Sequence, residues 1–417
     1  MAKLQLKSKV FIFVILISLV ACTFKKKSDP PNTLHLLSIA KIKGLDPIYS
    51  DDLYSGTEIG HVYEGLVQYH YLKRPYTLIP NLAEAMPEIS KDGKKITFKI
   101  KKGVFFQDNP CFKATAGKGR ELEAQDFVYS FKRLADPKLT SAGWWVFDGK
   151  ILGLNEWREE NTKNKTTDYQ KEVQGLITPD KYTLQISLKQ PSAQFIYSLA
   201  MAYSYAVPKE AVEYYGKEFI NHPVGTGPFR LEEFNPSSKV VWIKNPTYRK
   251  EYYPSEGEPG DKEKDLLNDS GKPLPLSDKI IVYIFEESQP QWLSFLAGKL
   301  DYSGIPKDNF DSAITSTKEL KSELKTKGIV IYKNANLEIT HTSFNMEDPL
   351  IGKNKYLRQA LSVAHNQEEY NKLFYNYRAL SAQGPIPPGL AGYDPDFKNP
   401  YRQHNPEKAK ELLKRAG

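Results

Sequence analysis

Apolar and polar residues alternate with two different periods along the chain, which predicts strands and helices in mixed order. Residues 96–100 (ITFKI) and 182–188 (YTLQISL) make every second side chain apolar, as a half-buried strand does. Residues 124–135 (AQDFVYSFKRLA) instead carry apolar side chains at helical spacing, and Pro137 follows as a stop signal. The alternation of the two patterns predicts an α/β fold.

Continuous apolar runs predict two further strands. LHLLSIA (34–40) is expected as a buried first strand, and IIVYIF (280–285) as a strand buried on both faces. Between them, residues 48–59 are expected to form a loop and residues 61–69 (HVYEGLVQY) a helix. Residues 250–278 lose all periodicity and gather proline, glycine and charge, which predicts a surface loop.

The first thirty residues carry the pattern of an export signal. Three lysines precede the run VFIFVILISLV (10–20), which would span about 16 Å as a helix, roughly half of a bilayer core. This predicts a signal peptide over residues 1–21, with an uncleaved signal anchor as the alternative. The ending LVAC resembles a bacterial lipobox, which implies cleavage before Cys22 and lipidation of that cysteine. Residues 22–32 would then form a lipid-anchored tether.

Composition and charge narrow the class of protein. The 417 residues are 40% apolar, enough for two or three packed lobes, and the mean hydropathy of −0.52 excludes a polytopic membrane protein. Loss of residues 1–21, with three lysines and no acid, lowers the formal net charge by three, from +8 to +5. Because basic and acidic residues are interleaved, no nucleic-acid partner is expected. With Cys22 acylated, Cys111 would have no intrachain disulfide partner.

The stretch HPVGTGPFRLEEF (222–234) is rich in glycine and raises the question of a nucleotide or phosphate site. Its glycines do not follow dinucleotide spacing, no Gly-Lys-Ser/Thr triplet occurs, and Pro228 would remove a donor from a phosphate site. We therefore predict a tight turn, packed against a neighbouring lobe. The scattered histidines predict no metal site, and neither a cofactor nor a G-x-S-x-G nucleophile is indicated. A hydrolase built from distant carboxylates stays open at this point.

A series of short segments carries a family resemblance in one order over residues 33–417: GLDPIYSDD, VYEGLVQY, ITFKIKKGVFFQD, LEAQDFVYSFKRLADPK, HPVGTGPFRLEEF, IKNPTYRK, FLAGKLDYSGIP, TSFNMEDP and LRQALSVAHNQEEY. Together they resemble the extracytoplasmic solute-binding proteins of ABC importers, of the oligopeptide/dipeptide-binding (family 5) type. The resemblance implies two hinged α/β lobes with an extra subdomain on lobe one. Lobe one would comprise residues 33–70 and 206–284, the subdomain 71–205 and lobe two 285–417. Family members later return to lobe one, so lobe two is expected to be incomplete at Gly417.

The implied function is that of a non-enzymatic, monomeric receptor. It would capture a peptide in the cleft between the lobes and deliver it to a membrane permease with its ATPases, while the lipid anchor holds it to the membrane. The alternatives are a different solute (a nickel chelate or an oligosaccharide), a secreted hydrolase, and an adhesion or signalling lipoprotein.

The resemblance also implies ligand contacts at positions that match the family's segments, and for each of them simple packing is the alternative role. The positions are Tyr49, Asp51, Asp52, Tyr54, Trp144, Trp145, Gly225, Thr226, Gly227, Tyr248, Glu286, Glu287, Phe344 and Asn345.

Three segments depart from the family pattern. QDNPCFKATAGKGREL is an insertion carrying Cys111, His365-Asn366 replaces the usual acidic-basic pair, and residues 250–278 are longer than typical. Because loops of this kind set ligand preference, the sequence does not predict which ligand is bound.

Overall fold

The computed structural model describes residues 29–333, 336–390 and 392–417. The expected signal peptide, Cys22 and most of the tether lie outside these residues. Among the described helices, none is both long and apolar enough to cross a membrane.

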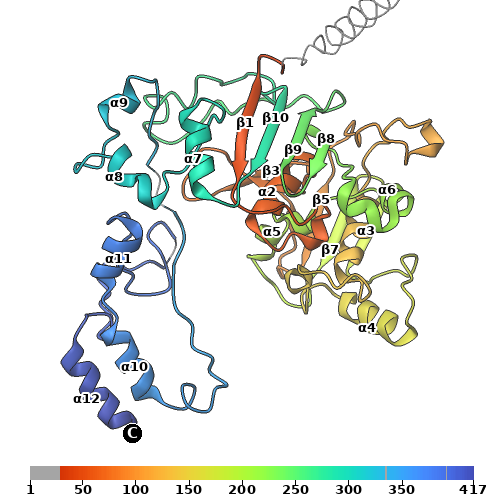
Figure 1. Ribbon diagram of the computed structural model, residues 1–417. Coiled ribbons are helices and arrows are strands. Elements are labelled where there is room, and N and C mark those ends of the chain that lie inside the picture. The colour runs from red at the N-terminus through yellow and green to blue at the C-terminus, as the bar shows by residue number, and fades with distance from the viewer. Residues whose placement is uncertain (1–28, 334–335, 391) are drawn as a thin grey trace, which may run out of the picture.

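The first sheet contains four strands in the order β1-β10-β9-β8 (Figure 1). β1 runs parallel to β10, and Leu36 pairs with Val282, so the two apolar runs lie side by side. Both strands are confirmed, and residues 280–282 are buried. The burial expected for the first strand is wrong, because β1 is an edge strand and is mostly half-buried. The strands are β1 (Thr33–Ser38), β10 (Lys279–Ile284), β9 (Lys239–Lys244) and β8 (Phe229–Asn235).

The second sheet contains four antiparallel strands in the order β4-β5-β7-β6. The hairpin β4–β5 turns at Gly93, and the alternation predicted for residues 96–100 and 182–188 is confirmed, because Phe98 and Leu184 are fully buried. Helix α3 packs against this sheet with Phe127 and Phe131 inward, as its spacing predicts. The elements are β4 (Glu88–Ile89), β5 (Lys95–Lys99), β6 (Leu176–Asp180), β7 (Thr183–Ser187), η2 (Lys113–Thr115), α3 (Ala124–Ala135), η3 (Trp144–Val146), α4 (Leu154–Asn164), α5 (Phe195–Ser198), η4 (Ala202–Ser204), α6 (Lys209–Tyr215) and η5 (Gly216–Asn221).

The connection that follows β1 corrects the sequence prediction. Residues expected to form a loop instead form the helix α2 (Leu53–Val62), and the expected helix contains the strand β2 (Val67–Tyr69), which pairs with β3 (Leu78–Pro80). Asp52 starts the helix, because its side chain accepts a hydrogen bond from the Ser55 amide at 2.8 Å. Gly65 follows its end, where a Cβ would lie 2.7 Å from the carbonyl oxygen of Leu199. This close approach of the distant Leu199 segment sets the C-terminal boundary of α2.

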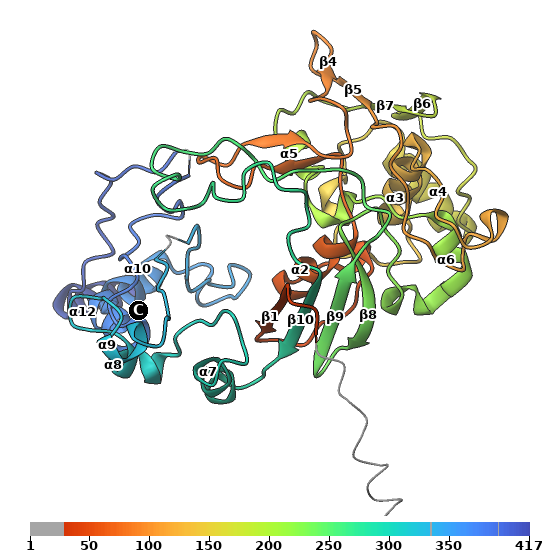
Figure 2. The same ribbon diagram turned by 90° about the horizontal axis from the view of Figure 1, so that it is seen from above.

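Described residues after Ile284 are helical or irregular, and no strand is found among them. They form two small apolar clusters, one around Trp292 and one joining Val363 to Leu412, apart from the main core of the two sheets. Figures 1 and 2 show α10–α12 at a distance from the sheets. The helices are α7 (Ser288–Leu296), η6 (Lys307–Asn309), α8 (Phe310–Ala313), α9 (Ser322–Lys325), α10 (Lys355–Ala364), α11 (Gln367–Tyr375) and α12 (Pro406–Ala416).

Candidate ligand-binding face

The loop between β1 and α2 is held in place by a buried ion pair. Asp46 accepts hydrogen bonds from Arg133 of α3 at 2.7 and 3.0 Å, and both side chains are almost fully buried. The 3₁₀ helix η1 (Pro47–Tyr49) follows directly, with Tyr49 half-buried against the core. Burial raises the pKa of Tyr49 and the charge of Asp46 raises it further, so its hydroxyl stays neutral. Tyr54, in the first turn of α2, is also half-buried against the core.

Asp51 and Asp52 come next in this loop and share one cation. Lys43 Nζ lies 3.0 Å from Asp51 and 3.6 Å from Asp52, and the Lys43 side chain is exposed. Burial raises the pKa of Asp52, but the hydrogen bonds from Ser55 and the charge of Lys43 outweigh it and lower the pKa overall. The two carboxylates therefore place negative charge near the surface. Only their exposed ion pairs with Lys43 offset this charge, and exposed ion pairs are weak.

Trp144 and Trp145 occupy different environments in η3. Trp144 is half-buried against the core with the Arg158 guanidinium 5.0 Å from its ring, whereas Trp145 is 57% exposed. The rings of Trp145 and Tyr203 meet edge to face, with centroids 6.5 Å apart. Sequence reasoning missed Tyr203 of η4, because no local pattern marks it.

Tyr203 brings the two predicted groups together. Its pKa is raised by burial and then by the charges of Asp51 and Asp52, and its helix η4 contacts η1, which lies just before the two carboxylates in the chain. Ser141, just before η3, also donates a hydrogen bond to the Ile48 carbonyl at 2.8 Å. We call the surface formed by Tyr49, Asp51, Asp52, Trp145 and Tyr203 the aromatic-acidic face.

The turn Gly225-Thr226-Gly227 lies inside the protein and does not contribute to this face. The Gly227 amide donates to the Val62 carbonyl at 2.9 Å and so caps the end of α2. A Cβ at Gly225 would lie 1.9 Å from the same oxygen, and Thr226 donates to Glu64 at 2.9 Å. The glycines are therefore required by a close backbone approach. The nearest backbone is that of α2, within the same predicted lobe, and the Gly225 carbonyl also accepts a hydrogen bond at 2.9 Å from the amide of Gln107, in the predicted subdomain.

The remaining candidates are dispersed. Tyr248 is half-buried below the Arg249 guanidinium, and Phe344 is half-buried while Asn345 is exposed, in a segment without helix or strand. Glu286 forms an exposed ion pair with Lys41 at 3.2 Å, and Glu287 is the residue before α7. Two hydrogen bonds join the chain just beyond α7 to β1. The Asp301 amide donates to the His35 carbonyl at 2.9 Å, and the His35 amide donates to the Asp301 carboxylate at 2.7 Å.

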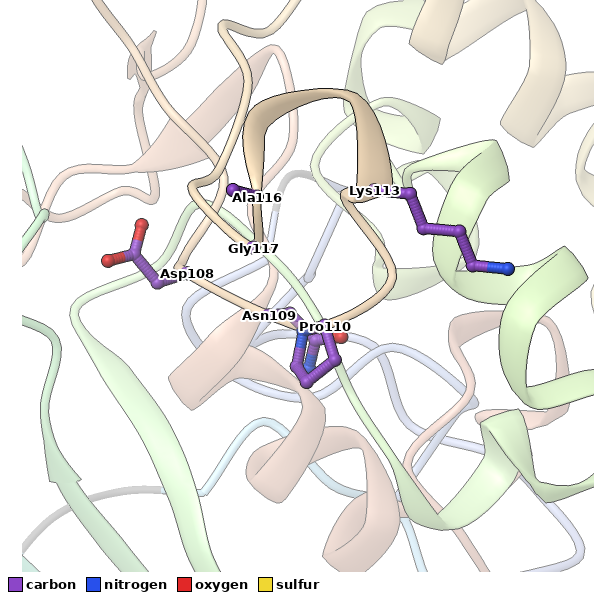
Figure 3. A pocket seen from close by; sticks show the side chains of 6 residues that line it. All are labelled: Asp108, Asn109, Pro110, Lys113, Ala116 and Gly117. Atoms are coloured by element: carbon purple, nitrogen blue, oxygen red, sulfur yellow. The ribbon is translucent and has the colours of Figure 1, made fainter.

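A broad, open hollow of about 560 Å³ lies on the inserted segment, outside the aromatic-acidic face. Figure 3 shows Asp108 and Lys113 at its rim, pointing in opposite directions. Beneath it, burial and then the charge of Glu210 raise the pKa of the Cys111 thiol to about 12. The thiol is therefore protonated at neutral pH and is a poor nucleophile.

Buried titratable groups also occur inside the main core. Glu58 of α2 accepts a hydrogen bond from Trp242 at 2.6 Å, and burial raises the pKa of its carboxyl to about 7 despite that bond. Burial lowers the pKa of the neighbouring His61 to about 4. In the part of the chain that the structure describes, no group of three or more potential ligands is arranged to hold a metal.

The structure is that of a mixed α/β protein with open sheets. The sequence matches the family described as bacterial extracellular solute-binding proteins, family 5 Middle, over residues 77–417. The chain belongs to this family. Its fold is that of the two-lobed periplasmic binding proteins, and proteins of this family are non-enzymatic transport components, so the hydrolase alternative gains no support.

Individual relatives bind peptides, according to their names. The dipeptide-binding protein of Escherichia coli (strain K12) is 28% identical over 350 residues, covering 82% of this chain and 55% of the relative. Di/tripeptide-binding protein 2 of Pseudomonas aeruginosa (strain UCBPP-PA14) is 26% identical over 399 residues, covering 93% and 64%. The structure of the Helicobacter pylori periplasmic binding protein DppA in complex with peptide STSA superposes with a TM-score of 0.71 at 25% identity, covering 92% and 66%. The chain thus spans between about half and two thirds of the length of these relatives.

Proposed function

We propose that this protein is the substrate-binding component of an ABC importer, which captures peptides and delivers them unaltered to a membrane permease. The observation that supports it most is the family match over residues 77–417, together with relatives that carry di- and tripeptide-binding names. A single chain would act with its permease subunits and their ATPases. No cofactor, metal or nucleic acid takes part in the proposed role.

The aromatic-acidic face suits a peptide physically. The exposed ring of Trp145 offers an apolar surface beside the buried Tyr203 ring, and a bound side chain would remove the Trp145 ring from water. The exposed ion pair between Lys43 and Asp51 contributes little to stability, so Asp51 could exchange its partner for a cationic group of the ligand. Closure of the second lobe over this face would complete the site.

The lobe boundaries and the cellular location belong to the same proposal. The shared sheet of β1 and β8–β10 supports grouping residues 33–70 with 206–284, and the separate sheet at 88–187 supports a subdomain over 71–205. Residues 285–417 would belong to lobe two. An export signal over residues 1–21 and a lipid anchor on Cys22 would place the protein outside the cytoplasmic membrane.

A different solute is the second candidate. Heme-binding protein A of Haemophilus influenzae (strain ATCC 51907 / DSM 11121 / KW20 / Rd) is 25% identical over 362 residues, so the family's ligands extend beyond peptides. Calorimetric titration of the purified protein with di- to pentapeptides, free amino acids and heme distinguishes the two. Saturable one-to-one binding of a peptide is expected; binding of heme alone would replace the proposal with the second candidate.

A further inference from the structure

A second cavity, of about 230 Å³, lies between the hairpin β2–β3 and residues 248–274 and shares no lining residue with the aromatic-acidic face. We propose that this cavity binds an uncharged phenol ring, either free or as the side chain of a tyrosyl compound. We call it the tyrosine pocket, after Tyr71, Tyr248 and Tyr252 in its wall. The proposal does not depend on peptide transport.

Several contacts hold the two segments that enclose the tyrosine pocket. The rings of Tyr71 and Tyr253 are parallel within 2°, with centroids 6.2 Å apart. Lys73 Nζ lies 3.1 Å from Glu256, and the Arg74 amide donates to Glu258 at 3.1 Å. The pocket is therefore formed before any ligand arrives, which lowers the entropic cost of binding.

The charges around the pocket compensate one another. Arg249 donates to Glu64 at 2.7 and 2.9 Å, to Asn81 at 2.7 Å and to Glu251 at 2.7 Å. Glu251 also accepts from Lys101 at 2.8 Å. No charge is left over to bind an ion, so an uncharged ligand fits best.

Hydrogen-bonding capacity remains at His70 and Tyr248. The amides of Leu72 and Lys73 both donate to Nδ1 of His70, at 3.2 and 3.1 Å, so in the neutral ring the proton resides on Nε2. His70 is 9% exposed and lines the pocket. Among the described residues, neither His70 Nε2 nor the Tyr248 hydroxyl has a hydrogen-bond partner. A ligand hydroxyl could form a hydrogen bond with either group.

The apolar residues of the wall favour a ligand whose polar group is carried by a flat, apolar ring. Ile79, Pro80, Pro254 and Leu274 line the pocket beside the tyrosine rings. A cavity of about 150 Å³ holds benzene, so the larger volume here has room for a ring with one or two substituents.

The test is a ligand-observed NMR titration of the full chain with p-cresol and with N-acetyltyrosinamide. Gln68→Trp places an indole in the pocket from the half-buried strand β2, and we expect it to abolish saturable binding. Tyr248→Phe removes one hydroxyl and should weaken binding about three- to tenfold, the value of one hydrogen bond. Tyr214→Phe makes the same change on the exposed side of α6 and should leave binding unchanged.

The outcomes separate the proposal from its alternatives. Preference for p-cresol indicates a site for free phenols, and preference for N-acetyltyrosinamide indicates a site for tyrosyl compounds. Equal affinity of p-cresol for the wild type, Gln68→Trp and Tyr248→Phe would overturn the proposal, as would tighter binding of methyl glucoside. Because Tyr248→Phe preserves the ring, the test remains decisive even where Gln68→Trp does not fold.

Discussion

The adjacent residues Trp144 and Trp145 allow ligand binding to be separated from folding. Since Trp145 is 57% exposed, Trp145→Ala should weaken peptide binding about tenfold while changing the unfolding free energy by less than about 0.5 kcal/mol. Trp144→Ala removes a ring packed between the core and Arg158, and should cost about 1–3 kcal/mol. Calorimetry and thermal unfolding measure the two effects.

Tyr214→Ala is the matched control for Trp145→Ala, because it removes another exposed aromatic ring, on α6. Tyr214→Ala should change neither the peptide affinity nor the unfolding free energy. The site assignment fails when Trp145→Ala lowers stability and leaves peptide affinity intact.

Glu58 makes stability depend on pH, because its carboxyl is buried on α2. Its pKa rises from 4.5 to about 7 in the folded protein, so between these values the folded state holds the extra proton and stability falls as pH rises. Glu58→Gln should match the wild type below pH 4.5 and exceed it by up to about 3 kcal/mol above pH 7.

Urea unfolding at several pH values tests the Glu58 prediction. His61, with a pKa lowered by burial to about 4, acts in the opposite direction between pH 4 and 6.5, but it is present in both proteins and cancels in the difference. Glu263→Gln, on an exposed loop, should show no pH-dependent gain. If Glu58→Gln raised the unfolding free energy by the same amount at every pH, the carboxyl of Glu58 would titrate normally and the prediction would be wrong.

At the scale of elements, the join between α2 and the turn before β8 is a contact that leaves no room for a side chain. A Cβ at Gly225 would lie 1.9 Å from the Val62 carbonyl oxygen, so Gly225→Ala should cost about 3 kcal/mol of unfolding free energy. Gly60→Ala is the control on the same helix; no atom lies within 4 Å of its Cβ, and it should stabilise the protein by about 0.5–1 kcal/mol. Urea denaturation that ranks the two variants in the opposite order would contradict this account.

Strands and helices could be predicted from the sequence where their own residues carry the hydrophobic period of that element. The period-two stretch at 96–100 and the helical stretch at 124–135 become β5 and α3 because their apolar side chains face one shared core. The boundary between α2 and β2 could not be predicted, because it depends on the approach of the distant Leu199 to Gly65. For the same reason, the pairing of Trp145 with Tyr203, from distant parts of the chain, left no local signal.

For the whole molecule, membrane anchoring should depend on one cysteine. Cys22→Ser should abolish incorporation of labelled palmitate and move the protein from the membrane to the soluble fraction, since two acyl chains or more are needed for stable anchoring. Cys111→Ser is the matched control, because that thiol is buried, and it should label normally. Unchanged labelling of Cys22→Ser would disprove the lipid anchor.

The account as a whole requires that a peptide be held and released intact. The most direct measurement incubates the protein with a mixture of short peptides, isolates the complex by gel filtration and identifies the bound molecules by mass spectrometry. We predict that uncleaved peptides are recovered from the wild type and are depleted from Trp145→Ala. Recovery of cleaved peptides, or of none while another solute co-elutes, would contradict the proposed function.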